Sequence, residues 1–157
     1  METRRFDSRD NSSKRLCDVP DRPGIAAEIF EAIGRRGIII DMIVQGIDGT
    51  DGSTSLSFTV NESSLAEAAK IVNESADAEN PNVESADGIA KLTVSGIGLR
   101  SHTQVGEMLF GCLAESKINV EMINTSELQV NAVVDGDKAQ DAMDSLRETF
   151  ADSLGSV

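Results

Sequence analysis

The chain has 157 residues, of which 39% are hydrophobic and only 3% aromatic, with no Trp and no Tyr. This length allows one domain or two small ones, and any core must be built from aliphatic side chains. The formal net charge of −13 argues against nucleic-acid and anionic-membrane partners, because both reward basic patches. No apolar run approaches a membrane span and the N-terminus is too polar for a secretory signal, so we expect a cytoplasmic protein.

The first half of the chain alternates between strand-like and helix-like spacing of apolar residues. The spacing predicts strands over 14–19, 38–44 and 54–60, and helices over 24–36 and 63–73. The second of these strands is almost continuously apolar, which is typical of a strand buried on both faces.

Two polar segments flank these elements. Residues 1–13 resemble a tail when taken alone. Residues 75–87 contain Pro81 and predict a linker with one short strand near Val83.

The second half of the chain repeats the same order. Its apolar spacing predicts strands over 91–97, 118–123 and 128–134, and helices over 104–116 and 137–150. The two halves keep register at an offset of 80 residues, as shown by the pairs Ile25/Val105, Ile29/Leu109, Phe30/Phe110, Ile33/Leu113, Ile38/Ile118, Ile40/Val120, Asp41/Glu121, Met42/Met122 and Ile43/Ile123. We therefore predict an α+β chain of two ferredoxin-like βαββαβ modules in tandem, each an antiparallel sheet with helices on one face.

The most informative stretch runs from Val19 to Gly24 and leads into the first helix. Pro20 and Pro23 cannot donate to a sheet, so the strand must end there. The first N–H groups of the following helix have no partner within it, and the positive end of its dipole favours a small anion, such as the carboxylate of an amino acid. The alternative is a strand-to-helix turn with an ordinary cap. Asp21 fits either reading, as a partner for an ammonium group or as a turn residue.

Five motifs carry a resemblance to a known family. They are Val19–Ala27, Gly37–Gln45, Asp51–Val60, Gly98–His102 and Ile118–Glu127. Together they resemble the tandem ACT domains that form the regulatory part of aspartate kinase, and the resemblance covers residues 14–150. It implies ACT domains over 14–87 and 88–157, with residues 1–13 as a possible edge strand of the second domain.

The resemblance also implies feedback control. In this family lysine, threonine or both bind between ACT modules of two paired chains and inhibit a separate kinase domain. We therefore expect a homodimer through ACT domains, a catalytic domain or α subunit of aspartate kinase as partner, and L-lysine or L-threonine as effector. The effector-binding residues implied are Asp21, Pro23, Gly24, Ile25, Ala26, Ile39, Ile40, Asp41 and Gln45 from the first copy, and Asn119, Val120, Thr125, Ser126 and Glu127 from the second copy of a partner chain.

The chain departs from the family pattern at three places. Ile39 and Asn124 stand where the family usually has Asn and Ser, and Thr103-Gln104 replace the usual Pro-Gly. We therefore expect one effector site for each pair of copies. Two alternatives stay open: a free-standing tandem-ACT sensor that is not attached to a kinase, and a degenerate assembly module that binds nothing.

No motif in the sequence supports catalysis by this chain. It contains no kinase domain, no phosphate-binding loop and no dinucleotide fingerprint, so we expect no catalytic residue and no cofactor. His102 is the only histidine, and its distance in sequence from Cys17 and Cys112 does not match a metal site. Both cysteines fall within apolar patterns and are read as buried small hydrophobes in a reducing compartment.

Overall fold

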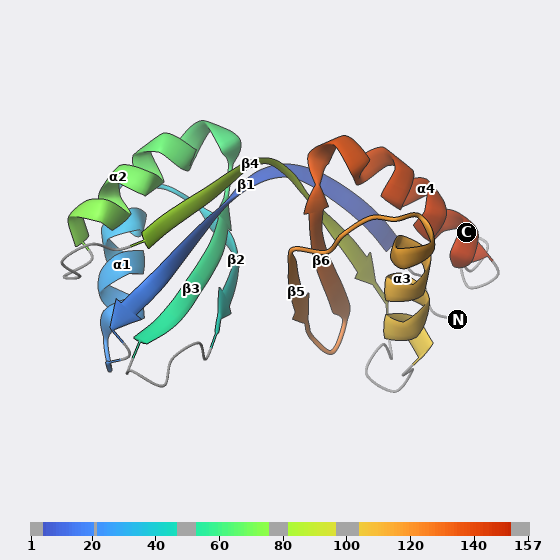
Figure 1. The fold of residues 1–157 in the computed structure, drawn as a ribbon, viewed down its shortest axis with the longest axis horizontal. Coiled ribbons are helices and arrows are strands. Elements are labelled where there is room, and N and C mark those ends of the chain that lie inside the picture. The colour runs from blue at the N-terminus through green and yellow to red at the C-terminus, as the bar shows by residue number, and fades with distance from the viewer. Residues whose placement is uncertain (1–4, 21, 47–52, 76–81, 97–103, 152–157) are drawn as a thin grey trace. The chain divides into compact units, whose positions relative to one another are not determined.

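The computed structural model describes residues 5–20, 22–46, 53–75, 82–96 and 104–151 (Figure 1). Its elements are β1 (Arg5–Pro20), α1 (Ile25–Gly34), β2 (Ile40–Gln45), β3 (Ser53–Val60), η1 (Glu62–Ser64), α2 (Leu65–Ser75), β4 (Asn82–Ser95), α3 (Gln104–Glu115), β5 (Met122–Thr125), β6 (Gln129–Asp135), η3 (Gly136–Lys138) and α4 (Ala139–Thr149). No helix in these ranges is both long and apolar enough to cross a bilayer.

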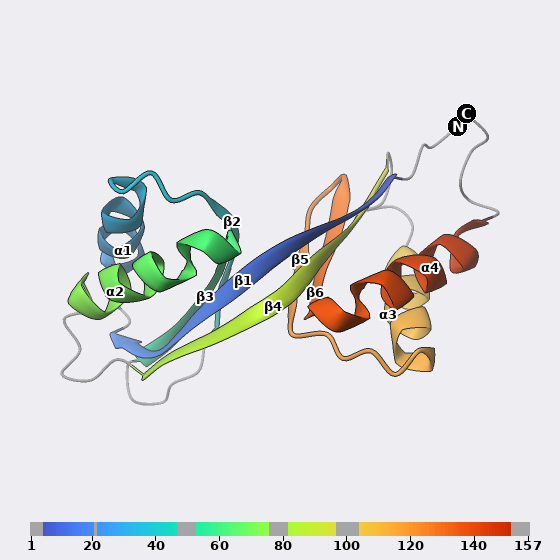
Figure 2. The same cartoon turned by 90° about the horizontal axis from the view of Figure 1, so that it is seen from above.

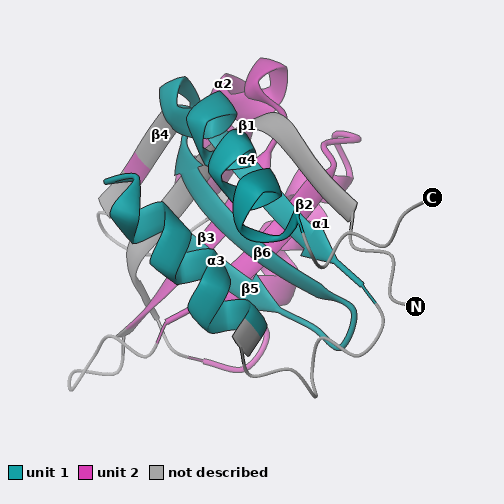
Figure 3. Cartoon of the chain, turned by 90° about the vertical axis from the view of Figure 1, so that its right-hand side faces the viewer, with its two compact units in different colours: residues 1–10, 88–157 teal, residues 11–87 magenta. Residues whose placement is uncertain are grey.

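The chain divides into two compact units, coloured separately in Figure 3. In chain order, the first unit here is residues 11–87 (magenta, unit 2 in the key of Figure 3), and the second unit is residues 1–10 together with 88–157 (teal, unit 1 in that key). β1 and β4 are long strands that each contribute to both units, and they are neighbours in the sheet (Figure 2).

In the first unit the strand order is β2-β3-β1-β4, with β3 antiparallel to both β1 and β2. Helices α1 and α2 cover one face of these strands (Figure 1). The core lies between the helices and the sheet and consists of Ile25, Ile29, Ile33, Ile38, Leu56, Phe58, Val60, Ala68, Ile71 and Val72. Phe30 packs edge-on against Phe58, with ring centroids 5.6 Å apart.

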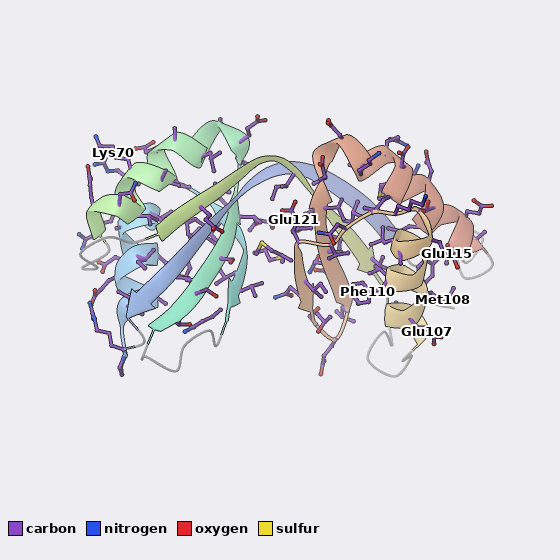
Figure 4. All side chains as sticks on the ribbon, in the orientation of Figure 1. Lys70, Glu107, Met108, Phe110, Glu115 and Glu121 are labelled. Carbon is purple, nitrogen blue, oxygen red and sulfur yellow. The ribbon has the colours of Figure 1, made fainter. Side chains whose placement is uncertain are left out.

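In the second unit the strand order is β5-β6-β4-β1, with β6 antiparallel to both β4 and β5. Its core includes Ala90, Leu92, Val94, Val105, Leu109, Cys112, Leu113, Ile118, Val130, Ala132, Val134, Ala142, Met143, Leu146 and Phe150. Met108 and Phe110 of α3, labelled in Figure 4, are half-buried and pack against this core. The predicted α+β class, with two modules that are each built on an antiparallel sheet, is confirmed.

Two predictions about strands are wrong. Val83 lies in a strand, as predicted, but residues 82–87 are not a linker around a short strand, because they form the first part of β4, which continues to Ser95. The strand at 38–44 is not buried on both faces: Met42 is buried, but Ile43 is 44% exposed, since β2 lies at the outer end of the strand order.

Two strand boundaries also differ from prediction. The strand predicted over 14–19 begins at Arg5, because backbone pairing with neighbouring strands, such as Ser12 with Val60, does not require apolar side chains. The strand predicted over 118–123 begins only at Met122.

One close backbone approach is made possible by glycine. Gly88 in β4 has a φ of +65°, and Gly136 at the start of η3 lies directly against it. A Cβ on Gly136 would lie 2.9 Å from the carbonyl carbon of Gly88 and closer still to its oxygen. Any side chain at position 136 would therefore displace the backbone of β4.

Candidate effector site

The turn that leads into α1 has the geometry that its sequence suggests. Gly24 is the N-cap of α1, with a φ of +98°, and no cap hydrogen bond from a described side chain is found there. The N–H of Ile25 donates to the carbonyl of Arg22 at 3.3 Å, and the first intrahelical bond runs from the N–H of Glu28 to the carbonyl of Gly24 at 3.0 Å. The N–H groups of Ala26 and Ala27 therefore have no acceptor within the helix.

Arg22 and Glu28, on either side of this turn, form an ion pair. The Arg22 guanidinium donates to both carboxylate oxygens of Glu28, at 2.8 and 2.6 Å. The hydrogen bonds from Arg22 are the largest cause of a pKa of Glu28 below its ordinary value; desolvation opposes them, and the charge of Arg22 adds the smallest contribution. Glu28 Oε1 would lie 3.9 Å from a Cβ on Gly24, so the carboxylate sits beside the N-cap.

This pair is not among the site residues predicted from the sequence. In the sequence Arg22 is part of the turn motif, and Glu28 is six residues further along. Helical pairs are expected at a spacing of three or four, so this contact across a Pro-Gly turn has no simple sequence signal.

The predicted residues of β2 are separated by a β-bulge. Ile40 pairs with Val60 and Met42 with Thr59, so Asp41 is the extra residue and projects outward, exposed. The N–H of Met42 donates to the Thr59 hydroxyl at 3.1 Å, in a buried position. A bulge changes the direction in which side chains point, so the extra residue Asp41 determines on which face of the sheet the side chains of residues 42–45 lie.

The topology places Gly24 and Gln45 at the same end of the first unit. β1 and β2 are both antiparallel to β3, so they run parallel, and the end of β2 lies with the start of α1. Ile39, just before β2, lies at the opposite end of that strand, about 20 Å away from Gln45 at the rise of an extended chain. Its side chain is 73% exposed.

The predicted residues of the second copy lie just before β5, in β5 and in the turn that follows it. Val120 is half-buried against the core, and Asn119 beside it is exposed. Glu121, labelled in Figure 4, corresponds to Asp41 in the repeat, and its N–H donates to Val133 at 2.8 Å. Thr125 ends β5 and is exposed.

Ser126 and Glu127 form the turn between β5 and β6. The Ser126 N–H donates to the carbonyl of Gln129 at 2.7 Å, and the Ser126 hydroxyl accepts from the N–H of Gln129 at 3.1 Å. Ser126 therefore stabilises the hairpin, and both turn residues are exposed. Asp21 and the motif Gly98–His102 lie outside the described residues.

Two observations concern metal-binding and thiol groups among the described side chains. No group of three or more His, Cys, Asp and Glu among them could hold a metal ion. Cys112 is buried and donates its thiol hydrogen to the carbonyl of Leu109 at 3.2 Å. Burial raises the pKa of the Cys112 thiol, which disfavours the reactive thiolate.

Comparison with known proteins agrees with this architecture. ACT-domain family models match residues 16–77 and 92–150. The fold and these two matches define a protein built from tandem ACT domains, which are amino-acid-binding regulatory modules.

The regulatory subunit of aspartate kinase from Thermus thermophilus, solved in its ligand-free form, is 30% identical. The match covers 92% of this chain and 96% of that subunit, with a TM-score of 0.84. A crystal structure of aspartokinase α and β subunits has a chain that is 32% identical, with coverage of 95% and 97% and a TM-score of 0.82. The chain therefore belongs to the aspartate kinase family, as its regulatory ACT region.

The full-length aspartokinases extend well beyond this chain. The aspartokinase of Helicobacter pylori is 38% identical over 132 residues, which are 84% of this chain and 32% of that enzyme. The chain thus spans about a third of the length of this curated relative.

Proposed function

We propose that this chain is the amino-acid sensor of an aspartate kinase and slows aspartate phosphorylation when lysine, threonine or both accumulate. The observation that carries the proposal is the turn at Gly24, where the N–H groups of Ala26 and Ala27 have no acceptor in α1. Its two regulatory domains are residues 14–87 and 88–157, and residues 5–10, at the start of β1, add an edge strand to the second. We place the protein in the cytoplasm, where its amino-acid effectors are made.

The proposed site matches the chemistry of a zwitterion. The effector's carboxylate accepts from the N–H groups of Ala26 and Ala27 and is stabilised by the positive end of α1. Its ammonium group pairs with Asp21. The remaining contacts of the first copy are Pro23, Gly24, Ile25, Ile39, Ile40, Asp41 and Gln45.

A second copy of the chain completes the proposed site. Because Gln45 and Ile39 lie at opposite ends of β2, the first-copy contacts of one site come from the first copies of both paired chains. We propose that Asn119, Val120, Thr125, Ser126 and Glu127 of a partner chain close the site, so that effector binding favours one arrangement of the dimer. The catalytic domain or α subunit of aspartate kinase responds to that arrangement.

Isothermal titration of the purified chain with lysine, threonine and methionine tests effector binding. We expect heat from lysine or threonine, and a loss of at least tenfold in affinity for Gly24→Asp, which adds a fixed negative charge beside the amides. Gly37→Asp is the matched control, because Gly37 also has a positive φ, +72°, but lies beyond the C-terminal end of α1. It should share the cost of a strained backbone and still bind.

Each other outcome has a definite meaning. No heat from any amino acid would overturn effector binding and leave the degenerate assembly module, for which the exposed Ile39 is the supporting feature. Equal affinity of Gly24→Asp and the unchanged chain would move the site away from α1. Effector binding without co-purification of a kinase from the source cells would favour the free-standing sensor.

A further inference from the structure

The ion pair between Arg22 and Glu28 lies at the place where the proposed effector carboxylate would bind. Glu28 belongs to the first turn of α1, and its carboxylate folds back to the N-cap beside Gly24. Arg22 lies just before Pro23 and Gly24 and donates hydrogen bonds to both carboxylate oxygens of Glu28. The pair therefore spans the turn that presents the N–H groups of Ala26 and Ala27.

A carboxylate in this position has two opposing effects. It stabilises α1, because a negative charge in the first helical turn interacts favourably with the helix dipole. It also occupies the same positive end that a bound anion would use, and two carboxylates a few ångströms apart repel each other. Unless its charge is compensated, Glu28 would weaken binding of any effector through its carboxylate.

We propose that Arg22 is a positioning residue that holds and neutralises Glu28, and thereby keeps the start of α1 able to accept the effector's carboxylate. The bidentate geometry matters here, since two parallel N–H···O bonds fix the carboxylate as well as compensate its charge. Side-chain exposures of 39% for Arg22 and 50% for Glu28 leave the pair accessible to solvent ions, so its effect depends on salt. The inference rests on the proposed effector site.

A double-mutant cycle measured by effector titration tests this role. Arg22→Ala alone should weaken effector binding by about three- to tenfold, because it uncovers the charge of Glu28. Glu28→Gln alone should leave affinity unchanged or raise it up to about threefold. In the double variant, the loss caused by Arg22→Ala should shrink to less than about twofold, because no charge is left to neutralise.

The salt dependence of effector affinity is a second test of charge compensation by Arg22. Raising the ionic strength from about 0.05 M to about 0.5 M shortens the screening length, so the Arg22→Ala defect should shrink toward that of the double variant. Arg22→Lys should bind between the unchanged chain and Arg22→Ala, since Lys restores the charge without the bidentate contact.

The other ion pair along α1 supplies the control. Arg35 donates to Glu31 at 2.6 Å, near the C-terminal end of the helix. Arg35→Ala and Glu31→Gln should leave effector affinity unchanged, while any general effect on helix stability would appear in these variants as well.

The results that overturn the proposal are distinct from those that overturn the effector site. If the unchanged chain binds an effector and Arg22→Ala loses equal affinity with and without Glu28→Gln, Arg22 contacts the effector directly and the inference is wrong. If Arg22→Ala binds as tightly as the unchanged chain, the pair serves only the fold. If the unchanged chain binds no amino acid, the proposed function fails and this inference fails with it.

Discussion

Removal of the Thr59 hydroxyl is predicted to destabilise the first unit at the bulge of β2. Thr59 is fully buried, and its hydroxyl accepts the N–H of Met42 at 3.1 Å. Thr59→Val keeps the shape of the side chain but leaves that N–H without an acceptor, which costs about 1–3 kcal/mol. The methyl group that replaces the hydroxyl regains up to about 0.8 kcal/mol by burial. With the full gain from the methyl group, the expected net loss is about 0.2–2.2 kcal/mol.

Two measurements check this prediction. In urea, the unfolding midpoint should be lower, while the dependence of the free energy of unfolding on urea concentration should be unchanged. The melting temperature should fall by about 4–8 °C for each kcal/mol lost in a unit of this size. Native-state hydrogen exchange should show faster exchange of the Met42 amide, by about tenfold for each 1.4 kcal/mol of local stability. Exchange is the more decisive assay, because it reports on the first unit even if the two units unfold separately.

Thr59→Ser is the matched control for the hydroxyl. It keeps the acceptor and loses only a methyl group, so the Met42 amide should remain protected while stability falls by about 1 kcal/mol. If Thr59→Val unfolds at the original midpoint and Met42 exchanges as slowly as before, the hydroxyl does not hold the bulge and the reasoning is refuted.

Three further predictions concern the core, the glycines and pH. Phe58→Ala should lower the free energy of unfolding of the first unit by about 3–5 kcal/mol in urea, because Phe58 is fully buried, and a loss below 2 kcal/mol would contradict the packing described. Gly136→Ala should lower the free energy of unfolding by about 1–3 kcal/mol, because it forces the backbone of β4 away. Gly111→Ala, in α3 with no neighbour within 4 Å, should instead raise it by about 0.5–1 kcal/mol. Equal effects of the two variants would refute the close approach of Gly136 to Gly88. Because the pKa of Glu28 is lowered in the folded state, its pair with Arg22 stabilises the fold above about pH 4.3, and this stabilisation is lost as the pH falls through the folded-state pKa. An NMR titration should therefore find the pKa of Glu28 below its ordinary value and shifted upward in Arg22→Ala.

The helices could be read from the sequence because their signal is local. The stripe of Ile25, Ile29 and Ile33 on α1 is buried, as the 3.6-residue period requires. The 80-residue repeat likewise needed no structure, since the same pattern of core positions recurs in both halves. The turn at Gly24 was also predictable, because Pro and Gly restrict the backbone wherever they occur.

The strands could be placed only approximately from the sequence. Length and exposure of a strand depend on the partner beside it, which lies far away along the chain. β4 includes the polar residues 82–87 because its backbone continues to pair, and β2 exposes Ile43 because it has an outer position in the sheet. Periodicity reports the faces of a strand but not its neighbours.

The sequence by itself determined a repeated α+β fold, the mainly aliphatic character of its two cores and the glycine turn at the start of α1; the cores also bury Phe58 and Phe150. Only the tertiary structure decided the bulge at Asp41, the separation of Ile39 from Gln45 and the ion pair of Arg22 with Glu28. The physical reason is that propensity and apolar spacing act between residues a few positions apart. Bulges, strand order and contacts across a turn are instead fixed by backbone pairing and packing that the whole chain must satisfy together.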